Sequence, residues 1–273
     1  MKLILVHYKK NVQMKRKITM PVVLKITSII VLGVLMSCTG REKSNAEKKE
    51  SNVDADAVEQ AVEWISLFDG ETLDGWKRYN ADEIGPLWTV EDGAIKCDGK
   101  GHGEGSPEDG GSLITLKTFG NFELELEWRI SEGGNSGILY HVVEKPDYSH
   151  AYVTGPEFQV CDDPPVADDL SNLNKLAGSS YDMYAAPQTK KISPVMEWNT
   201  AKIVYMDGKV EHWLNGEKVV EFDESSEDFK ERFDQSKWST DEYPYWNTYK
   251  EGSIALQDHG AAVWYRNIRL RSL

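Results

Sequence analysis

Two polar runs in the second half of the chain carry side chains suited to proton transfer. In the first, residues 155–163, Glu157 and Gln159 alternate with apolar residues, and Asp162 follows just beyond them. Because side chains alternate across a β-strand, Glu157 and Gln159 would point to one face while the apolar residues anchor the other. The run therefore predicts a site rather than a surface pattern.

The second run, Gln257-Asp258-His259-Gly260, follows the apolar residues 254–256. Gln257 and His259 would share one face, and the two runs could meet. His259 is the preferred candidate for proton transfer because an unperturbed imidazole titrates near neutral pH. Glu157 and Asp162 are the carboxylates that could orient or replace it.

Each candidate has a plainer alternative. Glu157 and Asp162 could bind backbone groups at a strand end, since buried polar groups need partners whether or not they react. His259 before a glycine could be a turn residue.

The elements that must position these side chains are predicted to be strands. Residues 122–130 alternate apolar and charged, which is typical of a strand with one buried face. Asp207-Gly208 and Asn215-Gly216 favour tight hairpin turns between the strands 202–206, 209–214 and 218–222. Further strands are expected at 88–97, 112–117, 136–143, 156–161, 252–257 and 262–271.

Many short strands with turn residues between them predict an all-β fold, a two-sheet antiparallel β-sandwich. A curved sheet would give it a concave binding face. Residues 223–250 are longer than most loops of compact domains, which indicates a functional lid or local structure of its own, and residues 224–233 could hold a helical turn or two.

The first 37 residues contain seven basic and no acidic side chains, with an apolar run at 26–36. This pattern predicts a signal peptide at 1–37 of the lipoprotein type, with an ordinary signal peptide or an uncleaved anchor as the alternatives. Leu35-Met36-Ser37-Cys38 resembles a bacterial lipobox, which would place a lipid on Cys38 and the protein in the bacterial cell envelope, periplasmic or on the outer surface. Residues 38–61 are too polar to fold and are predicted to be a disordered tether, followed by one domain at 62–273.

The charge of the remaining chain excludes some partners. Without the seven basic leader residues, 24 of the 31 basic side chains face 45 acidic ones, a net charge near −21. Such a field repels phosphate backbones, which argues against nucleic acid as a partner and leaves neutral ligands open. Cys97 and Cys161 could form a disulfide or remain buried thiols.

A series of motifs resembles the 3-keto-disaccharide hydrolase domain family, in order from about residue 64 to 272. The motifs are Leu67-Phe68-Asp69-Gly70, Asp74-Gly75-Trp76, Gly134-Asn135-Ser136-Gly137-Ile138, the run of Glu157, Gln159 and Asp162, Glu197-Trp198-Asn199-Thr200, His212-Trp213-Leu214-Asn215-Gly216, Leu256-Gln257-Asp258-His259-Gly260 and Arg266-Asn267-Ile268. The family has a concanavalin A-like jelly roll, and its members act on glycosides already oxidised at the sugar 3-position. Two departures leave the substrate open: His141 replaces a common arginine, and residues 223–250 form a longer segment than usual.

What the resemblance implies is cleavage of a 3-keto-glycoside or 3-keto-disaccharide, by hydrolysis or by elimination. Glu157, Asp162 and His259 are then the catalytic candidates. The substrate-binding candidates are Asn135, Tyr140, His141, Gln159, Tyr181, Trp198, Asn199, His212 and Gln257. For His212, packing in the core is the competing interpretation.

The alternatives are a non-catalytic carbohydrate-binding lipoprotein and a direct two-carboxylate glycosidase. No Gly-x-Gly-x-x-Gly turn, the fingerprint of dinucleotide binding, joins a strand to a helix. The chain is therefore not expected to oxidise the sugar itself, and a separate oxidoreductase would have to supply the ketone. No cofactor is expected, and no ligand cluster predicts a transition metal. Calcium bound by carboxylates near 157–163 is the alternative.

Overall fold

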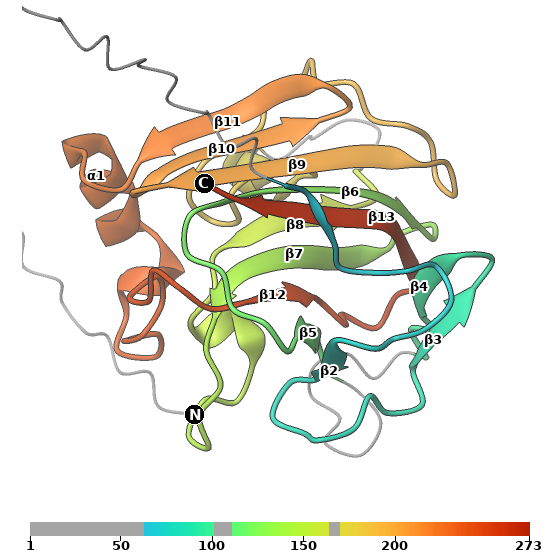
Figure 1. Ribbon diagram of the computed structural model, residues 1–273. Helices are drawn as coiled ribbons and strands as arrows, with labels where there is room; N and C mark the ends of the chain where they lie inside the picture. The colour runs from blue at the N-terminus through green and yellow to red at the C-terminus, as the bar shows by residue number, and fades with distance from the viewer. Residues whose placement is uncertain (1–62, 101–110, 164–169) are drawn as a thin grey trace, which may run out of the picture. The chain divides into compact units, whose positions relative to one another are not determined.

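Two antiparallel sheets pack face to face in this computed structural model, which describes residues 63–100, 111–163 and 170–273 (Figure 1). The expected signal peptide at 1–37 and lipidated tether at 38–61 lie outside these residues. Across the described ranges, no helix has the length and apolar character needed to cross a membrane.

The larger sheet has eight strands in the order β11-β10-β9-β6-β13-β4-β3, with β1 paired to β13. Its strands are β1 (Ile65–Ser66), β3 (Trp88–Glu91), β4 (Ala94–Cys97), β6 (Phe122–Ile130), β9 (Asn199–Met206), β10 (Lys209–Leu214), β11 (Glu217–Asp223) and β13 (Val263–Ser272). The smaller sheet has the order β2-β5-β12-β7-β8. Its strands are β2 (Trp76–Arg78), β5 (Leu113–Thr115), β7 (Asn135–Val142), β8 (Glu157–Cys161) and β12 (Ser253–Leu256). The predicted two-sheet sandwich is confirmed.

The expected alternation of strand β6 decides which face enters the core. Its apolar residues are buried against the smaller sheet, and its outward glutamates contact arginines of β13. These pairs are Glu123 with Arg271, Glu125 with Arg269, and Glu127 with Arg266. The charged ladder therefore covers the solvent side of the larger sheet.

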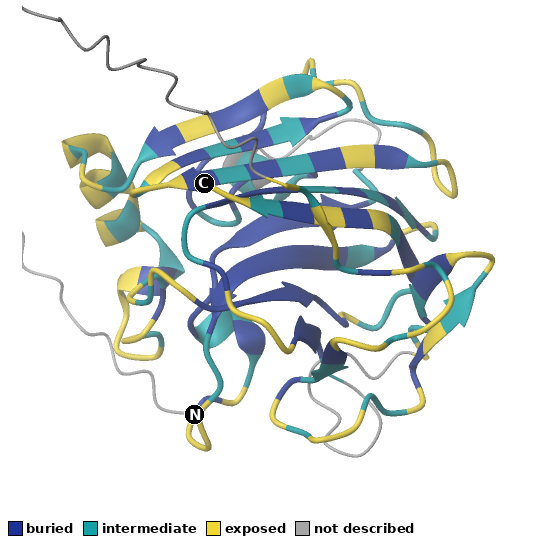
Figure 2. Ribbon diagram, in the orientation of Figure 1, coloured by how far each residue is buried: buried dark blue, intermediate teal, exposed yellow. Residues whose placement is uncertain are grey.

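The smaller sheet is covered on both faces. Strands β7, β8 and β12 are buried along almost their whole length (Figure 2). One face meets the core between the sheets, and the other packs on a second apolar cluster that includes Leu139, Tyr148 and Ala151. A polar side chain on this second face is consequently enclosed by loops rather than by the other sheet.

Local turn chemistry explains most strand boundaries. Asp207, Gly208, Asn215 and Gly216 all have positive φ, as the predicted tight hairpins require. The single strand expected at 88–97 is instead two strands, because Asp92 and Gly93 also adopt positive φ and form a third such turn. The short strands β1 and β2 lack a sequence pattern long enough to predict.

The long segment between β11 and β12 has structure of its own. It contains α1 (Glu227–Gln235) and the short 3-10 helix η4 (Lys237–Ser239). The Ser226 side chain caps α1 by accepting a hydrogen bond from the Phe229 amide, and Ser236 caps η4 in the same way through Trp238. The prediction of helical turns near 224–233 is confirmed, with the helix starting three residues later.

Both cysteines of the described part are buried free thiols, so the disulfide alternative is wrong. Cys97 lies at the end of β4 in the larger sheet, and Cys161 ends β8 in the smaller one.

Candidate functional site

A cavity of about 180 Å³ opens beside the ends of β7, β8 and β12 on the loop-covered face of the smaller sheet. Its lining consists of polar side chains from the strands and aromatic side chains from the loops. The lining residues are Asn135, Tyr152, Glu157, Tyr181, Lys237, Trp238, Tyr243, Gln257 and His259. Glu157 of the first polar run and Gln257 and His259 of the second therefore line one cavity.

The strand register brings the first run into the cavity. Gln159 pairs with Gly137 and Glu157 with Leu139, so Glu157 and Gln159 share the covered face. The Glu157 side chain lies across the backbone of Gly137, where an added Cβ would come within 2.4 Å of Oε1 of Glu157. Glycine at 137 is therefore needed to leave room for the carboxylate.

The side-chain amides of Gln159 and Gln257 each have an oxygen atom that accepts no hydrogen bond from the described residues. Nε2 of Gln159 donates to Oδ1 of Asn135 at 2.6 Å, which fixes both side chains. Within the described residues, Oε1 of Gln159 and Oε1 of Gln257 are buried without a hydrogen-bond partner. Of the two glutamines, only Gln257 lines the cavity. Because an unpaired buried acceptor costs free energy, its oxygen indicates a ligand that brings a hydroxyl donor.

His259 is exposed at the cavity entrance, on a turn held by its buried neighbour Asp258. The Asp258 carboxylate accepts hydrogen bonds from the Gly111 amide at 3.1 Å and the Gly260 amide at 3.0 Å. It also accepts one from the Cys97 thiol at 3.6 Å, and burial together with this carboxylate raises the pKa of Cys97. Asp258 positions the His259 turn, a role that sequence reasoning missed.

An aromatic wall closes the cavity on the loop side. Nε1 of Trp238 donates to the Tyr181 carbonyl at 3.1 Å, and the rings of Trp238 and Tyr243 meet edge to face with centroids 5.0 Å apart. Burial raises the pKa of Tyr181, with a smaller contribution from the Glu157 charge, so its hydroxyl stays protonated at neutral pH. Tyr152 and Lys237 were not among the candidates from the sequence. For Lys237 the unusual length of residues 223–250 was the available signal, whereas no sequence pattern singled out Tyr152.

Asp162 lies elsewhere, although it follows Glu157 closely in the chain. Its carboxylate accepts a hydrogen bond from the Gly133 amide at 2.8 Å, and its own amide donates to the Gly134 carbonyl. It does not line the cavity. The plainer interpretation, a carboxylate that binds backbone at a strand end, fits this placement.

Tyr140 and His141 are also away from the cavity, in the core between the sheets. A bulge in β7 breaks the alternation, since Leu139 and Val142 pair with Ala255 and Ser253 of β12. Both intervening side chains are fully buried, and His141 has a positive φ of 55°. Tyr140 faces the core together with Ile138, and the bulge turns His141 to the same side, so neither of these two candidates reaches the cavity.

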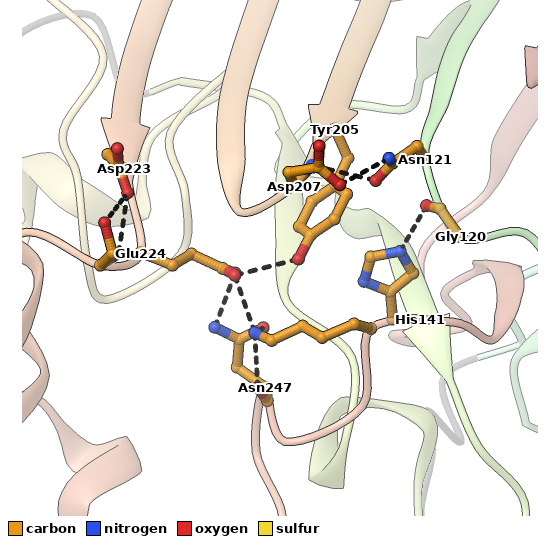
Figure 3. Close-up of polar contacts among 10 residues, drawn as sticks. Gly120, Asn121, His141, Tyr205, Asp207, Asp223, Glu224 and Asn247 are labelled. Carbon is orange, nitrogen blue, oxygen red and sulfur yellow. Dashed lines mark hydrogen bonds and ion pairs between the residues drawn. The ribbon is translucent and has the colours of Figure 1, made fainter. Parts of the chain in front are cut away.

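His141 belongs to a buried polar cluster that reaches the end of β11 (Figure 3). Its Nε2 lies 2.9 Å from the Gly120 carbonyl, and its ring packs edge to face on Tyr205. The Tyr205 hydroxyl donates to Glu224 at 3.0 Å. Burial lowers the pKa of His141, which favours a neutral ring in a structural role.

Three further substrate-binding candidates have structural partners outside the cavity. His212 is fully buried, with Nδ1 3.2 Å from the Gly178 carbonyl, and burial lowers its pKa to about 4. Asn199 is buried and accepts hydrogen bonds from the Ser193 amide and from Asn215. Trp198 stacks with Arg129 and Arg266 on the outer side of the larger sheet.

A larger hollow of about 770 Å³ lies over the outer face of the larger sheet, among residues such as Glu125, Glu127 and Trp213. Arg269 and Arg266 pair with the two carboxylates, and the Lys202 ammonium lies 4.3 Å from the Trp213 ring centroid. These polar groups are already satisfied, so the smaller cavity is the better candidate site. Among the described residues, no group of three or more His, Cys, Asp or Glu side chains could hold a metal ion.

Fold and site together define a β-sandwich protein with a polar, aromatic-walled cavity on its smaller sheet. A family model described as the 3-keto-alpha-glucoside-1,2-lyase-like domain matches residues 63–271. The chain belongs to this family. A protein of Bacteroides thetaiotaomicron named 3-keto-disaccharide hydrolase is 38% identical over 280 residues, covering 89% of this chain and 96% of that protein.

Two solved structures from Parabacteroides distasonis, both provisionally described as glycosyl hydrolases, share the fold. The first is 37% identical with a TM-score of 0.67 and covers 77% of this chain and 94% of its own. The second is 26% identical with a TM-score of 0.58 and covers 77% of this chain and 100% of its own.

Proposed function

We propose that this protein is an enzyme that cleaves the glycosidic bond of 3-keto-glycosides. Membership of the family and the relative named as a hydrolase support an enzyme acting on glycosides. The observation that carries the proposal is the convergence of Glu157, His259 and the partnerless amide oxygen of Gln257 on one small cavity. A volume of about 180 Å³ suits one sugar ring at the reacting position.

With a ketone at C3 of the sugar, these groups suffice to break the glycosidic bond. It acidifies the proton at C2, so that the Glu157 carboxylate can remove it as a general base. His259 then protonates the departing oxygen at C1 as the C1–O bond breaks. Asn135, which Gln159 fixes by a hydrogen bond, and Gln257 bind the sugar hydroxyls without adding charge.

The direct two-carboxylate mechanism has less support. Ordinary glycosidases place two acids across the scissile bond. Among the described residues that line the cavity, Glu157 is the one carboxylate, because Asp162 binds the Gly133 amide instead. A single base needs an already acidic proton, which the ketone provides.

The same proposal sets the protein in the bacterial cell envelope, periplasmic or on the outer surface, lipid-anchored through Cys38. A separate oxidoreductase would supply the 3-keto sugar. No cofactor is assigned to the reaction.

The test compares 4-nitrophenyl 3-keto-glucoside with 4-nitrophenyl glucoside. We expect release of nitrophenol from the oxidised compound only, and detection of a C1=C2 double bond in the sugar product would separate elimination from direct hydrolysis. Binding of the ketone without any aglycone release would identify a carbohydrate-binding protein and refute the enzyme. Equal cleavage of both compounds would favour the direct glycosidase.

A further inference from the structure

Lys237 is a cation built into the wall of the cavity by several independent contacts. Its backbone amide donates to Oδ2 of Asp182 at 2.9 Å, and the Ser236 side chain caps the short helix that Lys237 begins. The next residue, Trp238, is buried and stacks on Trp246 with centroids 4.9 Å apart. The position of Lys237 is therefore fixed by the fold.

The ammonium group is surrounded by aromatic rings that line the same cavity. Nζ lies 4.2 Å from the ring centroid of Trp238 and 4.5 Å from that of Tyr181. The rings of Tyr243 and Tyr152 follow at 5.6 and 5.8 Å. The negative faces of aromatic rings attract a cation and partly shield it from water, which strengthens its field toward the cavity.

The proposed reaction needs such a charge at one step. When Glu157 takes the C2 proton, the C2–H electron pair forms a C2=C3 double bond and the C3 carbonyl becomes an enolate oxygen. When the C3 carbonyl re-forms, the electrons make a C1=C2 double bond and the C1–O bond breaks. The negative charge is thus carried by the oxygen at C3 between the two steps, and a fixed donor there lowers both barriers.

We infer that Lys237 is a catalytic residue whose ammonium group binds the C3 oxygen and stabilises the enolate. The inference rests on the proposed function. It also accounts for substrate choice, because a hydroxyl at C3 develops no charge for the ammonium to stabilise. Lys237 would then distinguish a 3-keto sugar from an ordinary one.

The experiment uses Lys237→Met and Lys237→Arg, with Lys230→Met as a control on the exposed face of α1. Lys230 pairs with Asp234 and is 65% exposed. Two rates are measured on each variant: aglycone release from 4-nitrophenyl 3-keto-glucoside, and exchange of the C2 proton of methyl 3-keto-glucoside with deuterium oxide, followed by NMR. Exchange reports enolate formation alone.

We expect Lys237→Met to lower kcat and the exchange rate together by about 100- to 1,000-fold, with KM changed only a few-fold. Lys237→Arg should recover part of both rates, and Lys230→Met should match the wild type. Lys237→Met with the wild-type exchange rate would overturn the inference. So would a covalent adduct at Lys237 trapped by borohydride, which would assign an imine instead. Failure of the wild-type protein to cleave the ketone refutes the proposed function itself, so the two failures are distinguishable.

Discussion

Nδ2 of Asn247 donates a hydrogen bond to the Glu224 carboxylate at 2.8 Å, which joins the two ends of the segment that contributes Trp238 and Tyr243 to the aromatic wall. Glu224 also accepts from Nζ of Lys250 at 2.7 Å and from the hydroxyl of Tyr205 (Figure 3). Residues 225–246 between these ends carry Lys237, Trp238 and Tyr243. One buried carboxylate therefore closes the base of the loop that completes the cavity.

Removing the Glu224 carboxylate should make residues 225–246 more mobile. We expect Glu224→Ala to lower the free energy of unfolding by about 1 to 3 kcal/mol, because it leaves the buried Tyr205 hydroxyl without its acceptor. Cleavage within 225–246 by a protease should become faster, and kcat/KM should fall. Urea denaturation and limited proteolysis measure these effects. Glu221→Ala, which removes a 63% exposed carboxylate from β11, is the control; equal behaviour of both variants would argue against the closure.

Substitutions of Glu157 and Asp162 should affect different properties of the protein, although the two residues are only five positions apart. Glu157→Gln removes the proposed base and should lower kcat by about 100- to 10,000-fold without unfolding the protein. Asp162→Asn should leave kcat within a few-fold and instead lower the free energy of unfolding, because a charged acceptor for the Gly133 amide is lost. Steady-state kinetics and denaturation of both variants test this. A loss of kcat in Asp162→Asn as large as that in Glu157→Gln would show that Asp162 takes part in catalysis.

Gly137→Ala tests the packing of Glu157 without touching a polar group. The added methyl would lie 2.4 Å from Oε1 of Glu157, so the carboxylate must rotate away. We expect kcat/KM to fall by about 100-fold, as for other small displacements of a reacting group. Gly120→Ala is the matched control, since its nearest neighbour would be 3.7 Å away. Normal activity of Gly137→Ala would mean that the carboxylate position is not critical.

The buried His212 predicts how stability depends on pH. An unfolded histidine binds a proton near pH 6.5, whereas His212 resists protonation until about pH 4. The unfolded state thus binds more protons in this window, so stability present above pH 6.5 is lost as the pH falls toward 4. The contribution of His212 should drop by about 2 kcal/mol between pH 7.5 and 5.

Denaturation of the wild type and of His212→Gln at both pH values isolates this contribution, because other titrating groups cancel in the difference. The pH-dependent loss should be smaller in His212→Gln. Identical losses in the two proteins would show that His212 does not titrate on unfolding.

The sequence by itself determined the sandwich and one half of the site. Alternation in β6 and the Asp-Gly and Asn-Gly turns are local patterns, so strand pairing and buried faces follow from neighbouring residues. The alternation of residues 157–161 likewise placed Glu157 and Gln159 on one face. These predictions needed no knowledge of distant contacts.

Only the tertiary structure decided which polar residues share a cavity. A bulge in β7 turned His141 to the core side that Tyr140 already occupies, and no residue type in the strand predicts this bulge. Lys237 reaches the site because a long segment folds back and is closed at Glu224, far from the strands in sequence. Such contacts depend on how separate elements pack, and a local pattern carries no information about them.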